Sequence, residues 1–250
     1  MSDLIVEQFS RMLDGLGTGD PWPTLEASGF LDLLRSEDDG GAGLQLSDLF
    51  PLAFEIGRRP DAPAVIETMV ARLKTPAAVN VQDIQAALTS AGAEPSSARA
   101  LAAAVTAAQM AGALERLQEL TIEYAGARRQ FGREISKFQA IQQQISVMAE
   151  EVMAARMAAQ KAFVGQPLEI AHMRAAAAKL RAGQAAQAVC AIAHAVHGAI
   201  GVSQEHPLHL FTGRLHDLRM AHGGESYWAG RLGQWALSSA EDFTALARQL

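Results

Sequence analysis

The sequence predicts an all-α protein, and three observations support this fold class. Nearly half of the 250 residues are hydrophobic, but Ala supplies much of that count and only 6% are aromatic. Residues that favour strands never gather into alternating runs, whereas apolar residues recur at helical spacing over long stretches. A chain of this length can bury a substantial core, either as one large domain or as two small ones.

The first 75 residues predict an N-terminal helical domain made of short helices. Gly and Pro interrupt this region repeatedly, as at residues 15–19. Ser2-Asp3 can cap the first helix. The acidic stretch SEDDGGAG at residues 36–43 predicts a turn, because its Gly spacing does not fit a phosphate loop and its acids do not alternate as in a calcium loop. The expected helical segments are residues 4–13, a stretch that starts at 21–23, a helix from Ser47-Asp48 to Gly57, and residues 65–73.

Residues 76–97 predict a linker of ambiguous structure. The stretch AAVNVQDI is compatible with a short strand, and GAEPSS reads as a connection that ends in a helix N-cap. No internal repeat is visible in the chain. We therefore expect this segment to separate two helical regions.

From residue 98 the pattern changes to long helices that predict a C-terminal domain over residues 98–250. Apolar residues follow helical spacing, and Gly or Pro residues mark each break. Short connections between successive long helices favour an up-down four-helix bundle. The expected helices are residues 98–124, 141–159, 168–197, 208–220 and 226–237.

Composition and charge limit the classes of function. The net charge of −6 and the lack of a long basic tract argue against nucleic-acid binding. Cys190 stands alone, so an intramolecular disulfide is excluded and a reducing, cytoplasmic location is expected. The N-terminus does not read as a secretory signal. The most apolar window, residues 183–202, contains His194, His197 and two glutamines, which predicts a buried helix and no membrane span.

Nothing in the sequence predicts a metal site. The chain contains no zinc-type Cys/His spacing, no phosphate-loop motif and no nucleophile-elbow motif. All seven histidines follow residue 171, and His194 and His197 lie three residues apart on one predicted helix. No Glu-x-x-His pattern accompanies them, so we interpret these histidines as helix-packing or loop-capping residues.

One connection carries more chemistry than a turn needs. The segment YAGARRQFGREISKFQAIQQQ covers residues 124–144 between two predicted helices. Arg128 offers a planar set of donors suited to a pyrophosphate or a carboxylate. Gln130 and Gln139 add neutral hydrogen-bonding groups, and Phe131 offers a flat surface to a ring system. Spacing alone favours a plainer alternative, in which Arg128 binds helix carbonyls and Phe131 anchors the core.

This segment resembles the flavin-binding signature of the acyl-CoA dehydrogenase family, through Tyr124, Arg128, Gln130-Phe131-Gly132 and Gln139. The resemblance continues in order along the chain. Residues 29–58 are similar to the family's N-terminal helical domain, and AAAAKLRAGQAAQAV and residues 195–208 are similar to its later helix and Gly loop. Several motifs in the expected order outweigh the plainer alternative of a capped loop.

The resemblance implies a flavoenzyme that binds FAD and an acyl-CoA thioester of the fatty-acyl or steroid type. In this family a glutamate removes the α-proton, the flavin accepts the β-hydride, and an electron-transfer flavoprotein takes the electrons. Carried over by position, Arg128 would meet the FAD pyrophosphate. Gln130, Phe131 and Gln139 would line the same FAD, which in this family belongs to the neighbouring subunit.

The resemblance also assigns the Gly loop and the position of the base. Gly198 and Ala199 would lie under the adenosine-side phosphates across the dimer, with Ala195 where a Gln is usual. The family's catalytic Glu aligns with His222, or with Ala221 if the match slips by one residue. Glu225 lies beyond the glycines and needs a shifted loop to replace it. The family's other base position falls on residues 102–103, two alanines that cannot accept a proton.

The departures from the family pattern predict an incomplete enzyme. The family has a β-barrel-like middle domain, and residues 76–97 are too few to form one. The sequence therefore resembles the reduced chain of two-subunit dehydrogenases that act on steroid side-chain CoA thioesters. We expect it to complete the FAD site of a full-length partner in a heterodimer or heterotetramer. Two alternatives stay open: a non-catalytic scaffold that binds no flavin, and a self-sufficient enzyme that uses His222 or Glu225 as its base.

Overall fold

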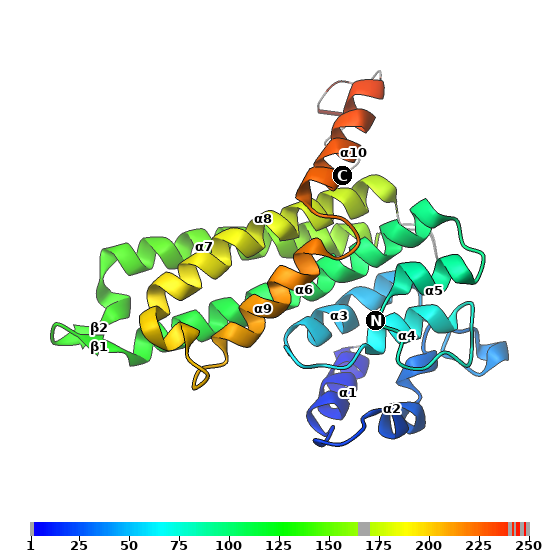
Figure 1. Ribbon diagram of the computed structural model, residues 1–250, viewed down its shortest axis with the longest axis horizontal. Coiled ribbons are helices and arrows are strands. Elements are labelled where there is room, and N and C mark those ends of the chain that lie inside the picture. Colours follow the sequence, from blue (N-terminus) through cyan, green and yellow to red (C-terminus); the bar gives the residue numbers. More distant parts are fainter. Residues whose placement is uncertain (1–2, 165–170, 240–241, 243, 246–247, 249–250) are drawn as a thin grey trace.

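The computed structural model describes residues 3–164, 171–239, 242, 244–245 and 248. The described residues are 74% helical, and their strands form one two-stranded sheet (Figure 1). The prediction of an all-α protein with a C-terminal helical bundle is confirmed. The expected start of one long helix at residue 168 and the expected cap at Ser2 lie outside the described residues.

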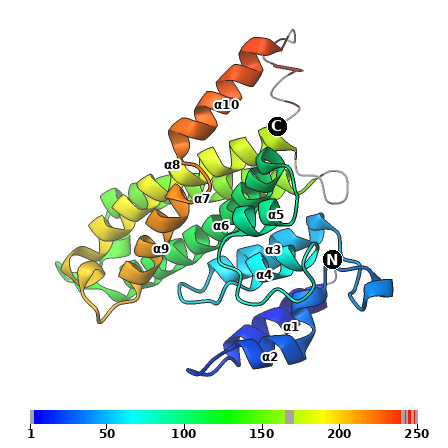
Figure 2. The ribbon, with the colours of Figure 1, turned by 45° about the vertical axis from the view of Figure 1, so that its right-hand side comes forward.

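Short helices make up the first part of the chain and lie together beside one half of the bundle (Figures 1 and 2). Local sequence explains their ends. Pro23 lies in the first turn of the second helix, Gly29 follows it at a φ of 74°, and the Gln45 N–H donates to the Asp48 carboxylate at the start of the next long helix. The elements are α1 (Asp3–Asp14), α2 (Trp22–Ser28), η1 (Phe30–Asp32), η2 (Glu37–Asp39), α3 (Leu46–Gly57), α4 (Val65–Arg72) and α5 (Ile84–Ser90).

The possible strand within residues 76–97 is not formed, and this region instead contains α5. The Asp83 side chain accepts a hydrogen bond from the Ala86 N–H and so caps the helix. Ile84 and Leu88, four residues apart, bury one face of α5 against the next helix. Residues 77–83 form turns and irregular structure before this helix, with Asn80 at a φ of 51°. The proposed division of the chain into domains at residues 75 and 97 stays a prediction.

Four long helices form the bundle, and a fifth stands away from it (Figures 1 and 2). The helix predicted at residues 208–220 has those bounds, and the last helix extends one residue beyond the prediction at each end. The elements are α6 (Pro95–Ala127), β1 (Arg129–Gln130), β2 (Arg133–Glu134), η3 (Ile135–Lys137), α7 (Gln139–Ala162), α8 (His172–His197), η4 (Gly198–Val202), α9 (Leu208–Met220) and α10 (Glu225–Ser238).

Alanines let the bundle helices approach closely, and α8 lies at its centre against α6, α7, α9 and α10. Within the described residues, one helix, His172–Val202, is long and apolar enough to cross a membrane by length and composition alone. A core helix gives the same signal, and α8 is packed on several sides by its neighbours. This arrangement agrees with the predicted buried helix.

Two glycines set the crossing of α3 and α6, which joins the first helices to the bundle. A Cβ on Gly57 would overlap the carbonyl oxygen of Gln109, and a Cβ on Gly112 would overlap that of Phe54. Neither position allows any larger residue without moving a backbone. Beside this crossing, Arg58 pairs with a glutamate of α6, Glu115, at 3.1 Å. The two helices are therefore in direct backbone contact.

Candidate functional site

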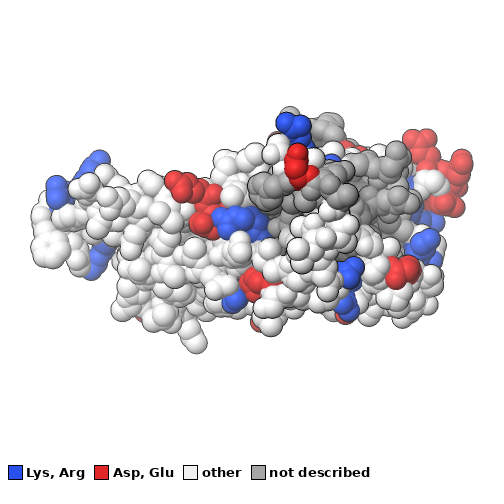
Figure 3. Space-filling model, turned by 90° about the horizontal axis from the view of Figure 1, so that it is seen from above, with Lys and Arg blue, Asp and Glu red and all other residues white. Residues whose placement is uncertain are grey.

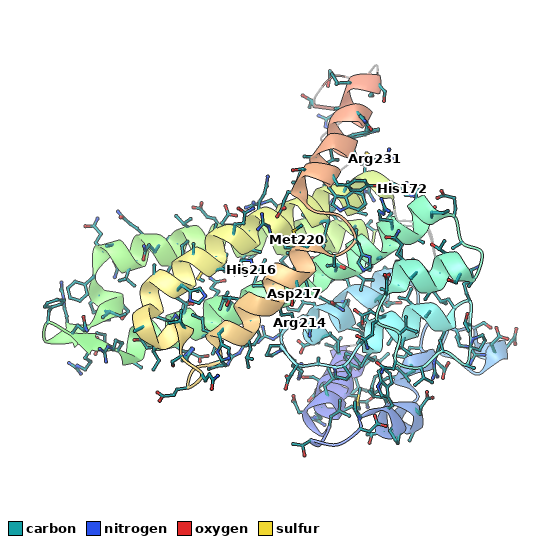
Figure 4. All side chains as sticks on the ribbon, in the orientation of Figure 1. His172, Arg214, His216, Asp217, Met220 and Arg231 are labelled. Atoms are coloured by element: carbon teal, nitrogen blue, oxygen red, sulfur yellow. The ribbon has the colours of Figure 1, made fainter. Side chains whose placement is uncertain are left out.

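The predicted site residues form two groups, which lie towards opposite ends of α6. Residues 128–139 follow the C-terminal end of α6, and residues 198–199 follow the end of α8 that meets it there. His222 and Glu225 lie just beyond α9, along which Figure 4 labels Arg214, His216, Asp217 and Met220. His222 faces Arg99 near the start of α6, and α6 rises about 43 Å from there to Arg128, so one chain does not bring the two groups into contact.

The first group lies on a hairpin with an unusual turn. The strands β1 and β2 pair antiparallel with Gln130 opposite Arg133, which leaves Phe131 and Gly132 as the turn. Their φ angles are 50° and 81°, as in a type I′ turn. Gly suits the second position, but a bulky residue at positive φ costs free energy. Phe131 is nevertheless 89% exposed, so the expectation that it anchors the core under the plainer alternative is wrong.

Some polar side chains of this hairpin have partners within the chain, and others have none within the described residues. Arg129 pairs with Glu134 at 3.7 Å, and the guanidinium of Arg133 lies 4.2 Å from the centre of the Phe138 ring. Arg128 is exposed, and its guanidinium makes no hydrogen bond or ion pair within the described residues. The exposed side-chain amides of Gln130 and Gln139 are likewise unpaired in that part of the chain.

The hairpin end therefore presents donors and an aromatic ring to its surroundings. The backbone beneath them is fixed, because the Ile135 N–H donates to the carbonyl of Arg128 at 2.9 Å. On the face seen in Figure 3, this end carries Lys and Arg atoms with no Asp or Glu atoms beside them. The arrangement suits an anionic ligand that also has a flat ring.

A stack of rings joins the hairpin end to the Gly loop. The Tyr124 ring, near the end of α6, lies 4.4 Å from the ring of His197, the last residue of α8, and is nearly parallel to it. His206 meets both rings from the following loop. Gly198 and Ala199, both exposed, come directly after His197. The structure thus brings the two predicted flavin-contact segments to the same end of the bundle.

The surroundings of the stacked histidines favour their neutral form. Nδ1 of His197 lies 2.8 Å from the Ala193 carbonyl, which can only accept, so this nitrogen carries the proton. Nδ1 of His206 accepts from the Leu208 N–H at 3.2 Å. Burial lowers the pKa of both histidines, and their mutual proximity lowers that of His197 further. Protonation would place a charge in a ring stack that is largely shielded from water.

We expect three histidines to reduce the stability of the protein as the pH falls below 6.5, an effect that the buried Glu67, whose pKa is raised by burial, opposes. His197, His206 and His222 all have folded-state pKa values below the usual 6.5, so the unfolded chain binds protons first. Their contribution is complete above pH 6.5 and is lost as the pH falls through the lowered values. Urea unfolding at pH 7.5 and 5.5 measures this loss, and His197→Phe, which keeps a stacked ring, should reduce it. An equal or higher free energy of unfolding at pH 5.5 would contradict the expectation.

The second group lies on the turn between α9 and α10. His222 has a φ of 56°, and its side chain is 15% exposed. Its Nδ1 lies 3.9 Å from the Asp83 carboxylate. Burial lowers the pKa of His222, Asp83 opposes that effect, and Lys179 and Arg99 add to it. The ring is therefore a neutral imidazole at neutral pH, which is the form that can accept a proton.

Glu225 is less suited to be a base. Its carboxylate is hydrogen-bonded to Nε of Arg219 and packs against Gly183 of α8. Burial raises the pKa of Glu225, but the hydrogen bond and charge of Arg219, together with hydrogen bonds from its own backbone N–H and from Gln187, outweigh burial, and the net pKa is lowered. A carboxylate in an ion pair is a weak proton acceptor, because the ion pair stabilises its charged form. Of the two predicted catalytic residues, His222 is therefore better suited to act as the base.

Sequence reasoning missed Lys179, which contacts the turn of the second group. Its side chain is 2% exposed, and its Nζ donates to the carbonyls of Arg219 and Gly223 at 2.8 and 3.2 Å. The available signal was a lone Lys on an Ala-rich face, with Ala175, Ala182 and others at helical spacing. Within the described residues, no group of three or more His, Cys, Asp or Glu side chains is placed to hold a metal ion.

A cavity of about 580 Å³ lies among α3, α5, α6 and the start of α8. Its wall is mostly apolar, and the Ser97 hydroxyl lies 3.4 Å from Nε2 of His172. None of the predicted site residues lines it. The lining residues are Leu46, Leu73, Lys74, Leu88, Ala93, Ser97, Ala98, Leu101, Ala171 and His172.

Comparison with known proteins places the bundle in a family. The protein-family model for the acyl-CoA dehydrogenase C-terminal domain matches residues 96–226, a little more than half of the chain. Acyl-CoA dehydrogenase IpdE2 of Mycobacterium tuberculosis is 37% identical over 116 residues, which cover 46% of this chain and 35% of that protein. The chain spans about a third or less of the length of the curated relatives that it matches.

Solved structures show the same likeness. The ChsE4-ChsE5 complex from Mycobacterium tuberculosis contains a chain with 28% identity and a TM-score of 0.54, over 58% of this chain and 40% of that one. A chain of the Tcur3481-Tcur3483 steroid ACAD (acyl-CoA dehydrogenase) has 19% identity and a TM-score of 0.74, over 94% of this chain and 98% of that one. This similarity shows a shared fold. The protein belongs to the acyl-CoA dehydrogenase family, and residues 96–226 match that family's C-terminal domain.

Proposed function

We propose that this chain is an accessory subunit of a heteromeric, FAD-dependent acyl-CoA dehydrogenase, and that its hairpin completes the flavin site of a full-length partner subunit. The observation that carries the proposal is Phe131, an almost fully exposed aromatic residue on a positive-φ turn. Beside it are the unpaired side chains of Arg128, Gln130 and Gln139.

The strain of this turn supports a role outside the chain's own fold. A non-Gly residue in the left-handed region costs on the order of 1 kcal/mol or more, and an exposed Phe gains no burial in return. Its ring meets that of Phe138 edge to face, with 6.0 Å between the ring centres, but this contact leaves Phe131 89% exposed. A flat ring that stacks on it from another subunit would bury it and offset the cost. FAD has such a ring system and a diphosphate.

The residues at the hairpin end fit a flavin contact. Arg128 would pair with the diphosphate through two parallel hydrogen bonds, and Phe131 would cover a ring. The amides of Gln130 and Gln139 would serve polar atoms along the same ligand. Gly198 carries no side chain and has a φ of 62°, so the backbone beside it is open to phosphate oxygens. When bound, FAD supplies the hydride acceptor for desaturation of an acyl-CoA thioester.

The need for a partner follows from the short stretch between the first helices and the bundle. Only residues 76–97 stand where the family has its middle β-domain, and they form α5 and the start of α6. In this proposal the hairpin contacts one side of the flavin, and residues of another chain contact the opposite side. The likeness to a chain of the ChsE4-ChsE5 complex, whose name records two different subunits, supports a heteromer. The steroid ACAD with the same fold favours a steroid or other bulky acyl group.

The proton-accepting group belongs to the partner in this proposal. On this chain, the family's Glu position aligns with His222, which faces Arg99 near the start of α6, about 43 Å along that helix from Arg128 at the hairpin. His222 would serve as the base only if this chain were self-sufficient. An electron-transfer flavoprotein would take the electrons from the reduced complex.

A second candidate is a non-catalytic scaffold that keeps the bundle and binds no flavin.

A reconstitution experiment distinguishes this scaffold from the accessory subunit. The chain is co-purified with a full-length acyl-CoA dehydrogenase subunit that carries a Glu base, and flavin bleaching by acyl-CoA is recorded. We expect bleaching in the complex, and also in a complex with His222→Asn, because the partner supplies the base. Loss of bleaching with His222→Asn favours the self-sufficient enzyme, and a complex without flavin favours the scaffold.

A further inference from the structure

We propose that Lys179 is a positioning residue that holds the α9–α10 turn in place and thereby fixes the ring of His222. This inference goes beyond the proposed function, which assigns the base to the partner subunit and gives His222 no step in the reaction. The contacts that carry it are independent of any ligand. They come from α8, α9 and the turn itself.

The ammonium of Lys179 binds the turn on both sides of His222. Its Nζ donates to the carbonyl of Arg219 at 2.8 Å, in the last turn of α9, and to that of Gly223 at 3.2 Å, just before α10. The last carbonyls of a helix have no partner within it, and a cation at this end also complements the helix dipole. One buried side chain therefore closes the end of α9 and fixes the residue after His222.

Other residues on the same face of α8 also contact the start of α10. Gly183 lies four residues after Lys179, on the same side of the helix, and its missing side chain leaves room for the carboxylate of Glu225. Ala176, three residues before Lys179, packs against Trp228 in the first turn of α10. Small residues of α8 thus contact α10 on both sides of Lys179. Together with Lys179, they fix the position of the turn on this face of α8.

The turn needs this support because its backbone is strained. His222 has a φ of 56° and Gly223 a φ of 110°, so a non-Gly residue adopts the left-handed region directly before a Gly. Strain of this kind persists only where the surroundings hold it. The groups that face His222 are Asp83 before α5, Arg99 of α6 and Lys179 of α8. Lys179 is the one of these three that also binds the turn's backbone.

Burying a lysine is costly, which argues that its contacts are specific. Burial lowers the pKa of Lys179 to about 8, an effect that Glu225 opposes and Arg219 strengthens. A Leu or Met would fill the same volume without that cost. The chain nevertheless has an ammonium here, and its donors meet backbone carbonyls, which an apolar side chain cannot bind.

The test uses the full chain without flavin or substrate, so its outcome is separate from that of the reconstitution experiment. Lys179→Met removes the donors, Lys179→Gln keeps a neutral donor, and Lys161→Met at an exposed position is the matched control. Hydrogen exchange is followed at the amides of Ala221 and Trp228, which bond to Asp217 and Gly224 at the two ends of the turn. The titration of His222 is followed by NMR and assigned with His222→Asn.

We expect Lys179→Met to speed exchange at both amides by about tenfold or more, since hydrogen bonds from a charged donor are lost. The pKa of His222 should rise towards 6.5 as the ring gains water and loses a nearby positive charge. Lys179→Gln should give a smaller effect, and Lys161→Met none. If Lys179→Met changes global stability but leaves the exchange rates and the titration of His222 unchanged, Lys179 only fills space and the proposal is wrong.

Discussion

Replacing Arg128 with Leu is expected to lower the FAD affinity of the heteromeric complex by roughly 10- to 100-fold. The guanidinium is exposed and unpaired within the described residues, so no internal contact competes with a diphosphate for it. Hydrogen bonds to charged groups contribute about 1.5 to 3 kcal/mol, which corresponds to this range. Equilibrium dialysis of FAD against the purified complex measures the change.

The hairpin provides its own control for this substitution. Arg129→Leu removes the same charge one residue away, but Arg129 already pairs with Glu134 at the surface. We expect the affinity to change by no more than about fivefold, the scale of an exposed ion pair. Equal losses for the two variants would mean that FAD senses only the net charge of the hairpin, and the assigned role of Arg128 would then be wrong.

Phe131→Gly tests the other half of the hairpin contact. Gly adopts a φ of 50° freely, so the isolated chain should unfold at a higher urea concentration. The complex should nevertheless bind FAD more weakly, because the exposed ring is gone. Opposite changes in stability and in binding are what a functionally strained residue produces. A variant that binds FAD as well as the wild type would leave Phe131 without a role in binding.

Gly112→Ala is expected to destabilise the protein by about 3 kcal/mol or more, and Gly57→Ala similarly. Each new methyl group would overlap a backbone carbonyl of the facing helix, and a change of side-chain rotamer cannot relieve that overlap. The two helices would have to separate, which would loosen the junction between α3 and α6. Urea unfolding followed by circular dichroism measures the loss.

Gly213→Ala in α9 is the matched control for this change. A Cβ there meets nothing within 4 Å, and the residue is exposed on a helix. Ala should therefore stabilise the helix by about 0.5 to 1 kcal/mol. A similar loss for Gly213→Ala and Gly112→Ala would show that the close approach of α3 and α6 is not what makes Gly necessary.

The long helices could be predicted from the sequence, because their pattern is local and extends over many turns. The helix at residues 208–220 lies between a Pro and a Gly pair, and the structure has the same bounds. The segment before α6 was ambiguous for the opposite reason. Its AAVNVQDI stretch has weak propensities, and the helical outcome depends on the cap at Asp83 and on burial of Leu88 against α6.

The details of the candidate site were less predictable. A hairpin with two residues in each strand is too short to show a periodic pattern. Gly132 is typical of a two-residue hairpin turn, but Phe131 is not, so the sequence does not indicate this turn clearly. The contacts of Lys179 join residues 40 and 44 positions apart, which no local pattern encodes. The ion pair of Glu225 with Arg219 likewise depends on how α10 leaves the bundle. The roles of these residues in catalysis and binding stay predictions.

The central claim is that the hairpin completes a flavin site on another subunit, and flavin retention tests it most directly. A full-length partner subunit is purified alone, with the wild-type chain, and with the Arg128→Leu chain, and each sample is passed over a desalting column. The bound FAD is then measured by its absorbance. We expect FAD to be retained in the wild-type complex, to be reduced with Arg128→Leu, and to be lost from the partner alone. Equal flavin in all three samples, or none in the wild-type complex, would contradict the claim.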